Sequence, residues 1–261
     1  MNREPAWLEP DWPAPPTVRA VVSTRFGPGV SAPPFDRCNL GDRCGDDPAA
    51  VAANRAALVR ALGLPRPPHW LTQVHGTAVV DVDRPHEPLP RADAAVSQRP
   101  GQPLVILTAD CLPVLLCERE GRAIGAAHAG WRGLAAGVLE RTVQALGVPP
   151  ARLLAWLGPC IGQASYEVGE EVRAAFVAGD AGAQQAFAPS RPGHWWCDLA
   201  LLARRRLQAL GVTAVHGGGF DTRTDARFYS WRRDGAASGR FATLLWLEDA
   251  RGAGAAAGGA D

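Results

Sequence analysis

One thiol and two imidazoles stand where apolar, strand-like runs of this sequence meet loops. His75 precedes the run TAVVDVD, Cys111 follows the run LVILTA after one aspartate, and His128 ends the run AIGAAH before a glycine-rich turn. Functional side chains concentrate where loops are held by rigid elements. A soft thiolate with two imidazoles is a zinc-type ligand set, and three protein ligands leave the fourth tetrahedral position open for water or substrate.

The same side chains permit a second chemistry, which these residues alone leave open. Cys111 and His128 could form a nucleophilic pair in which the imidazole activates the thiol. Both chemistries need the thiol and the imidazole close together, so spacing does not separate them. Asp110 directly precedes the thiol. We expect Asp110 to be catalytic with Cys111, as an orienting carboxylate or a general base, with a turn-capping role as the structural alternative.

Arginines and polar loop residues indicate a place for an anionic substrate. The turn AGWRG after His128 enters a predicted helix, and Arg132 adds a fixed positive charge beside the free backbone N–H groups of the helix start. A phosphate or carboxylate could bind there. The further residues expected to contact substrate or phosphate lie in glycine-flanked or arginine-rich loops: Arg25, Asn39, Tyr166 and Arg232, beside Arg233.

The elements that must position these residues follow from hydrophobic periodicity and from capping signals. Strands are expected at 17–24, 77–83, 104–108, 113–117, 123–128, 153–158, 226–232 and 241–247, and helices at 46–63, 132–147, 167–179 and 198–211. The runs 104–108, 113–117 and 123–128 are apolar on both faces, which favours central strands that are covered on both sides. Some strands are separated by turns too short for a crossover helix, which predicts mixed sheets with flanking helices.

The composition of the whole chain excludes several classes of function. Of 261 residues, 47% are hydrophobic, and the formal net charge of +1 gives no electrostatic indication of nucleic acid or an acidic membrane as partner. All 27 cationic side chains are arginine, so a Schiff-base, pyridoxal-phosphate or Walker lysine is impossible. Six scattered cysteines and the absence of a basic-then-apolar leader predict a cytoplasmic protein without disulfides.

Eight short motifs, in their order along the chain, resemble those of the laccase-domain family, also called polyphenol oxidases or peptidoglycan editing factors. They run from STRFGPGVS and NLGDRCGDDP through TQVHG, ADCLPVLL and HAGWRG to LGPCIG, YEVG and FYSWRRDG. The resemblance covers about residues 12–246. It implies an α+β fold in which mixed sheets form a sandwich-like core flanked by helices, in one catalytic domain at 17–248. A Pro-rich segment, 1–16, would precede this domain, and a disordered tail, 249–261, would follow it.

The resemblance also implies one zinc per chain on His75, Cys111 and His128. Family members are described as purine nucleoside enzymes that phosphorolyse adenosine, inosine and methylthioadenosine to the free base and a ribose 1-phosphate, and that deaminate adenosine. Many relatives carry a Cys-Thr pair where this chain has Asp221-Thr222, which argues against a role for a cysteine there. Six histidines are too few for a four-copper laccase, although a single copper would fit the same three ligands less well than zinc.

Three functions therefore remain at the level of sequence. The expected one is a zinc-dependent purine nucleoside phosphorylase and deaminase, whose partners are small purine nucleosides and phosphate, with no nucleic acid and no membrane. The alternative is a Cys–His hydrolase or amidase that edits peptidoglycan precursors. The third is a metal-binding protein without enzymatic activity. Metal content separates the first from the second, and substrate turnover separates both from the third.

Overall fold

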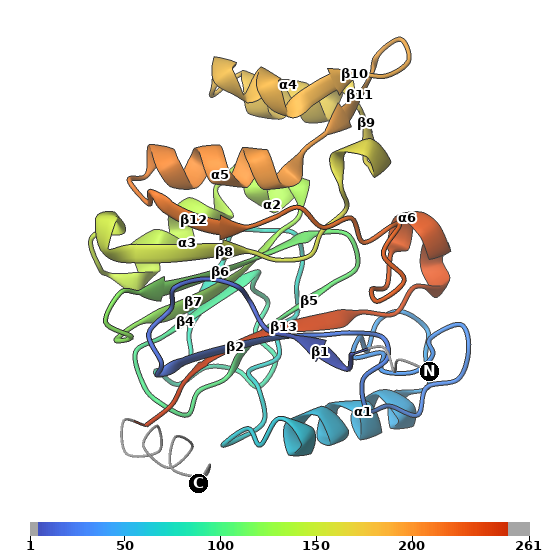
Figure 1. The fold of residues 1–261 in the computed structure, drawn as a ribbon, viewed down its shortest axis with the longest axis vertical. Helices are drawn as coiled ribbons and strands as arrows, with labels where there is room; N and C mark the ends of the chain where they lie inside the picture. Colours follow the sequence, from blue (N-terminus) through green and yellow to red (C-terminus); the bar gives the residue numbers. More distant parts are fainter. Residues whose placement is uncertain (1–4, 250–261) are drawn as a thin grey trace, which may run out of the picture.

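The computed structural model describes residues 5–249 and shows an α+β protein built around two stacked sheets (Figure 1). The larger sheet is mixed and has six strands in the order β12-β8-β6-β7-β4-β3. Its outermost pairs, β12 with β8 and β4 with β3, are parallel, and the inner pairs are antiparallel. The strands are β3 (Val79–Asp81), β4 (Ala94–Ser97), β6 (Leu112–Glu118), β7 (Ile124–Ala129), β8 (Leu153–Leu157) and β12 (Ala214–Gly217).

The smaller of the two stacked sheets is antiparallel and has the order β1-β2-β13-β5. Its strands are β1 (Trp7–Leu8), β2 (Val18–Ser23), β5 (Leu104–Thr108) and β13 (Phe241–Leu247). The described part of the segment 1–16 thus contributes β1 to a sheet of the core. A third, three-stranded antiparallel sheet consists of β9 (Glu167–Gly169), β10 (Phe187–Pro189) and β11 (His194–Cys197), with β11 in the middle.

Six α-helices and four short 3-10 segments lie in the described part of the chain. The α-helices are α1 (Pro48–Ala61), α2 (Trp131–Ala136), α3 (Val138–Leu146), α4 (Glu170–Val177), α5 (Leu199–Ala209) and α6 (Trp231–Asp234). The 3-10 segments are η1 (Pro150–Arg152), η2 (Gln163–Ser165), η3 (Ala181–Ala186) and η4 (Gly235–Ala237). No helix within residues 5–249 is long and apolar enough to cross a membrane.

The hydrophobic core consists of three clusters of buried side chains, which lie between the two sheets and between the sheets and the helices. Side chains of the two stacked sheets meet in one cluster, which includes Ile106, Leu115 and Phe241. The other face of the six-stranded sheet packs on α3 and α5, and α1 covers the outer face of the four-stranded sheet through Leu58. Figure 1 shows this stacking from α1, through both sheets, to α3 and α5. Both sheets are therefore covered on both faces, as the continuous apolar runs of β5, β6 and β7 predicted.

The helix ends show regular capping chemistry at several positions. The Asp47 carboxylate accepts a hydrogen bond from the backbone N–H of Ala49 at 2.9 Å, and Pro48 begins α1. Asp198 caps α5 in the same way through the N–H of Leu201. Gly147 ends α3 with a φ of 67°. These caps explain why α1, the end of α3 and the start of α5 lie where the sequence predicted them.

Four predicted elements differ from the structure. The helix expected over 167–179 is shorter, because Glu167–Gly169 form β9 and the helix α4 covers Glu170–Val177. The helix expected over 132–147 is interrupted at Gly137, whose left-handed φ of 98° separates α2 from α3. The strand expected over 226–232 is wrong, because this segment is a turn that leads into α6, which Ser230 caps. The strand expected over 77–83 is shorter, at Val79–Asp81. The tail predicted for 249–261 lies outside the described residues except for Asp249.

Candidate metal centre and its cavity

The pairing of β6 with β7 brings Cys111 close to His128. Pro113 of β6 lies opposite His128 in this antiparallel ladder, and Cys111 comes one residue before β6 begins. Asp110 has a φ of 87°, an uncommon conformation for a residue with a side chain, and it turns the chain at the connection from β5 to β6. The thiol therefore comes from a turn between the two stacked sheets, whereas the imidazole comes from the neighbouring strand of the larger sheet.

His75 reaches the same place from a loop held by a buried carboxylate. The Asp93 side chain, which is fully buried just before β4, accepts backbone N–H bonds from His75 at 2.8 Å and Gly76 at 2.7 Å, and weaker ones from Val74. His75 has a φ of 62°, and these bonds hold its backbone in that conformation. The ring centroids of His75 and His128 lie 4.7 Å apart.

Asp93 also fixes the orientation of the second imidazole. His128 Nδ1 lies 2.8 Å from Asp93 Oδ1, so its Nε2 is left to face the thiol. A carboxylate that holds the remote nitrogen of a histidine is the usual support of a metal-binding imidazole. Sequence reasoning missed Asp93, because it is one of 26 acidic residues and no motif marks it.

The three side chains form a compact set of donors. The ligand atoms of His75, Cys111 and His128 all lie within 4.8 Å of one another, and Cys111 Sγ lies 3.7 Å from His75 Nε2. It is the one cluster of three or more such side chains among the described residues. Ligands at about 2.0–2.3 Å from a single zinc ion are compatible with these separations. A Cβ at Gly130 would lie 2.8 Å from His75 Cδ2 and 3.0 Å from Cys111 Sγ, so glycine is needed beside the donors.

The electrostatics of the metal-free cluster favour a thiolate beside an imidazolium. Burial disfavours the thiolate of Cys111, but the charge of His128 and hydrogen bonds from both imidazoles outweigh it and lower the thiol pKa to about 6. Burial likewise disfavours the imidazolium of His128, but the thiolate and Asp93 raise its pKa to about 9. A deprotonated sulfur at neutral pH suits both a metal ligand and a nucleophile.

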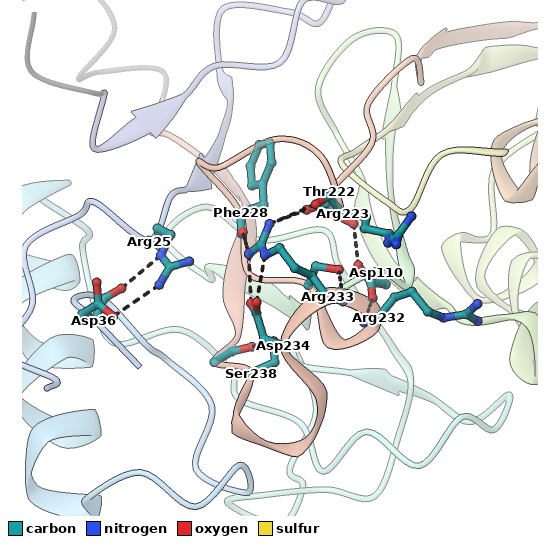
Figure 2. Close-up of polar contacts among 12 residues, drawn as sticks. Arg25, Asp36, Asp110, Thr222, Arg223, Phe228, Arg232, Arg233, Asp234 and Ser238 are labelled. Atoms are coloured by element: carbon teal, nitrogen blue, oxygen red, sulfur yellow. Dashed lines mark hydrogen bonds and ion pairs between the residues drawn. The ribbon is translucent and has the colours of Figure 1, made fainter. Parts of the chain in front are cut away.

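Asp110 lies beside the thiol, with both carboxylate oxygens occupied. Oδ1 accepts the hydroxyl of Thr222 at 2.6 Å, and Oδ2 accepts the backbone N–H of Arg232 at 2.6 Å. Figure 2 shows Asp110 between these two partners. Asp221, which directly precedes Thr222, accepts hydrogen bonds from the Ser165 hydroxyl and from the backbone N–H of Gly162. These contacts hold the carboxylate in one orientation, which favours the orienting role for Asp110.

The cluster opens into a cavity with a volume of about 520 Å³. Arg132, Tyr166 and Arg232, which the sequence singled out, line this cavity together with Asp110 and the three donors. Arg132 lies over the ring of Trp131 at 4.4 Å, and Arg232 lies over the ring of Tyr166 at 5.3 Å. Trp70 and Trp231 also line it. The cavity thus offers aromatic faces for a planar base and guanidinium groups for anions.

Two predicted contact residues lie elsewhere. Among the described residues that line the cavity, Arg25 and Asn39 are absent. Arg25 binds Asp36 and lies over the ring of Tyr229, apart from Asp110 in Figure 2. Asn39 is fully buried, and its side chain binds Gly41 and the backbone N–H of Arg240. Arg233 bonds to Asp234 and to backbone carbonyls of the 222–228 turn. These residues shape loops rather than the cavity surface.

Comparisons with known proteins agree with this architecture. Residues 19–248 match the family described as "Multi-copper polyphenol oxidoreductase laccase". A Pseudomonas aeruginosa protein named purine nucleoside phosphorylase is 59% identical over 246 residues, which cover 94% of this chain and 99% of the relative. Purine nucleoside phosphorylase YfiH of Escherichia coli is 49% identical over 241 residues, covering 92% and 98%.

Solved structures give the same result for the fold. The crystal structure of a Neisseria meningitidis protein has a TM-score of 0.89 at 42% identity and covers 94% of this chain and 100% of that one. The crystal structure of YlmD from Geobacillus stearothermophilus has a TM-score of 0.84 at 26% identity, covering 95% and 98%. The arrangement of sheets and helices is thus shared by proteins whose sequences differ widely.

Proposed function

The chain belongs to the multi-copper polyphenol oxidoreductase laccase family, and within it we propose a zinc-dependent purine nucleoside phosphorylase that also deaminates adenosine. Its substrates are adenosine, inosine and methylthioadenosine. The observation that carries this proposal is the set of His75, Cys111 and His128 at the wall of a cavity that also presents aromatic rings and arginines. The names of the Pseudomonas aeruginosa and Escherichia coli relatives support the phosphorylase activity.

The donors fit zinc better than the several coppers of the family description. Four of the six histidines lie outside the described lining of the cavity: His69, His86, His194 and His216. A multicopper oxidase needs many more imidazoles than the two that converge here. One thiolate, two imidazoles and an open fourth position are a catalytic zinc set. A zinc ion held by His75, Cys111 and His128 would supply Lewis-acid chemistry at the cavity wall.

The chain's own residues can perform the remaining work of phosphorolysis. Trp131 and Tyr166 offer faces against which a purine can stack, and Arg132 and Arg232 can hold phosphate in a bidentate manner. In the reaction, a phosphate oxygen bonds to ribose C1′ as the bond from C1′ to the purine nitrogen breaks. The electron pair leaves with the base, which takes up a proton. Asp110 keeps the Cys111 turn and the backbone of Arg232 in fixed positions through its two hydrogen bonds.

The alternative function is a Cys–His hydrolase or amidase that acts on peptidoglycan precursors. The lowered pKa of Cys111 and its approach to His75 within 3.7 Å favour it. A nucleophilic pair, however, needs only one imidazole. Here two imidazoles converge on the thiol, and one carboxylate, Asp93, organises both. This arrangement is the one expected of a metal site, and we therefore prefer the metal enzyme.

Product analysis tests the proposal. Purified protein is incubated with adenosine, with and without inorganic phosphate, and the products are separated by chromatography. Adenine and ribose 1-phosphate should form only with phosphate, whereas inosine and ammonia should form in both buffers. His75→Ala should abolish both reactions, and His86→Ala, a change of a second exposed histidine outside the cavity, should leave them intact. A lack of turnover of both adenosine and inosine would refute the proposal.

A further inference from the structure

A second group of arginines lines the cavity besides Arg132 and Arg232. It consists of Arg43 in the loop before α1, Arg55 on α1 and Arg240 directly before β13. Helix α1 with its preceding loop and the distant segment before β13 therefore supply guanidinium groups to one region of the wall. The proposed phosphorolysis needs one phosphate site, which Arg132 and Arg232 provide, so these three arginines are unexplained by it.

The two groups of arginines belong to different parts of the cavity. Arg132 and Arg232 also line an adjoining depression, together with Trp131 and Tyr166. None of Arg43, Arg55 and Arg240 is among the described residues that line this depression. The second group instead lies with Trp70 and Thr72, on the side of the cavity that α1 and the 41–44 loop form.

The second group carries an excess of positive charge. Arg55 pairs with Asp42 at 3.5 Å and lies 4.0 Å over the ring of Trp70. Arg43 donates to the hydroxyl of Thr72 at 3.0 Å, and the Arg240 guanidinium donates to the backbone carbonyls of Ser238 and Gly239. Within residues 5–249, Asp42 is the one carboxylate that forms an ion pair with any of the three. Three positively charged guanidinium groups thus have one carboxylate as ion-pair partner. The remaining net positive charge attracts an anion.

The loop that carries Arg43 is held in place by the other members of the group. Arg55 Nε donates to the carbonyl of Leu40 at 2.9 Å. The side-chain oxygen of Asn39 accepts the backbone N–H groups of Gly41 at 2.9 Å and Arg240 at 2.8 Å. A Cβ at Gly41 would lie only 2.6 Å from Arg240 Cγ, so the glycine allows the arginine to pack on the loop. The guanidinium groups are therefore positioned before any ligand arrives.

We propose that Arg43, Arg55 and Arg240 form a second anion subsite, which binds the 5′-phosphate of a purine nucleoside 5′-monophosphate. This inference rests on the proposed function, in which the base and sugar occupy the cavity beside the metal ligands. Guanidinium forks match phosphate oxygens in charge and geometry. The subsite extends the substrate class from nucleosides to nucleotides that carry a phosphate on the far side of the sugar from the base.

Rapid-mixing fluorescence of the cavity tryptophans tests this subsite, because it reports binding before turnover. Adenosine and adenosine 5′-monophosphate are compared as ligands, with inorganic phosphate as a competitor. The nucleotide should bind about tenfold more tightly than the nucleoside at low salt, and this ratio should fall as salt is added. Arg43→Gln and Arg240→Gln should each bring the ratio close to one. Arg60→Gln removes an equal charge from α1 outside the cavity and should preserve it.

The outcomes separate this subsite from the proposed function. If adenosine binds and its monophosphate binds no more tightly, the subsite is refuted while the nucleoside enzyme stands. If the ratio survives Arg43→Gln and Arg240→Gln but is lost in Arg132→Gln, the phosphate binds at the other arginines and the assignment is wrong. If inorganic phosphate binds in a manner that depends on Arg43, but the nucleotide binds no more tightly than the nucleoside, the three arginines are a site for free phosphate and the nucleotide subsite is refuted. If neither ligand binds and neither is turned over, both proposals fail.

Discussion

At the scale of single residues, Asp93 connects the parts of the candidate centre that are farthest apart in sequence. One of its oxygens accepts both the backbone N–H of His75 and the imidazole of His128, and the other accepts the N–H of Gly76. Burial raises the carboxyl pKa, but these hydrogen bonds and the charge of His128 outweigh it, so the pKa of Asp93 is lowered. Asp93 is thus an anion at neutral pH, and it organises two of the three donors.

Asp93→Asn should therefore weaken zinc binding about 10- to 100-fold. An amide NH₂ in this position would face backbone N–H groups, and the negative charge behind His128 would be lost. Zinc affinity is measured by competition with a chromophoric chelator. Asp83→Asn is the matched control, since Asp83 accepts a hydroxyl and a backbone N–H at the other end of β4. Equal zinc affinity in Asp93→Asn and the native protein would show that Asp93 only supports the fold.

The pKa of Cys111 provides a second residue-scale prediction. Because the thiol pKa is lowered to about 6, the thiolate is present at neutral pH and is lost only as the pH falls through about 6. Alkylation of metal-free protein by iodoacetamide should show this midpoint, and zinc should block the reaction. His128→Ala should move the midpoint upward, because the imidazolium that stabilises the thiolate is gone. A midpoint near 8.5 in the native protein, typical of a free thiol, would contradict the thiolate–imidazolium pair.

The residue types of the centre were predictable, but their supporting contacts were not. Histidine and cysteine are rare here, with six of each, so His75, Cys111 and His128 stand out at the ends of apolar runs. Asp93 does not, since its link to His128 spans 35 residues and depends on the pairing of β4 with β7. Arg25 and Asn39 looked equally suitable as ligand contacts, and only the three-dimensional path of their loops places them outside the cavity lining.

At the scale of elements, the ladder of β6 and β7 and the turn at Gly130 set the distances in the centre. The ladder fixes Cys111 near His128, and the missing side chain of Gly130 leaves room for His75 and the thiol. The apolar runs of β5, β6 and β7 were readable in the sequence, because strands covered on both faces are continuously apolar. The strand predicted for 226–232 is wrong, since Phe228 and Tyr229 pack in the core from a turn while Trp231 is exposed.

Gly130→Ala tests the role of this close approach. The new Cβ would lie within 3.0 Å of both His75 and Cys111, and therefore the donors must move apart. We expect zinc affinity to fall about tenfold or more while the far-ultraviolet circular dichroism is unchanged. Gly179→Ala, at a glycine with no atom within 4 Å of the added Cβ, should retain zinc. Full zinc affinity in Gly130→Ala would mean that the donors adjust freely.

At the scale of the whole molecule, the core runs from the four-stranded sheet through the six-stranded sheet to α3 and α5. The donors come from the turn that connects the two stacked sheets, from β7 of the larger sheet and from the loop before β3, so metal binding should tie these parts together. We predict a single unfolding transition in scanning calorimetry, raised by zinc, because a ligand at 100 times its Kd adds about 2.7 kcal/mol. The six cysteines are free. Two separated transitions would contradict a single folding unit.

We expect catalysis to require one metal ion on His75, Cys111 and His128. The most direct test is the phosphorolysis rate of metal-free protein titrated with zinc, followed by release of adenine from adenosine in phosphate buffer. We predict no activity before zinc is added, a linear rise with each addition, and a plateau at about one zinc per chain. In Cys111→Ala the same titration should stay flat. Full activity of the metal-free protein, with an adduct trapped on Cys111, would contradict metal-dependent catalysis and favour the cysteine nucleophile.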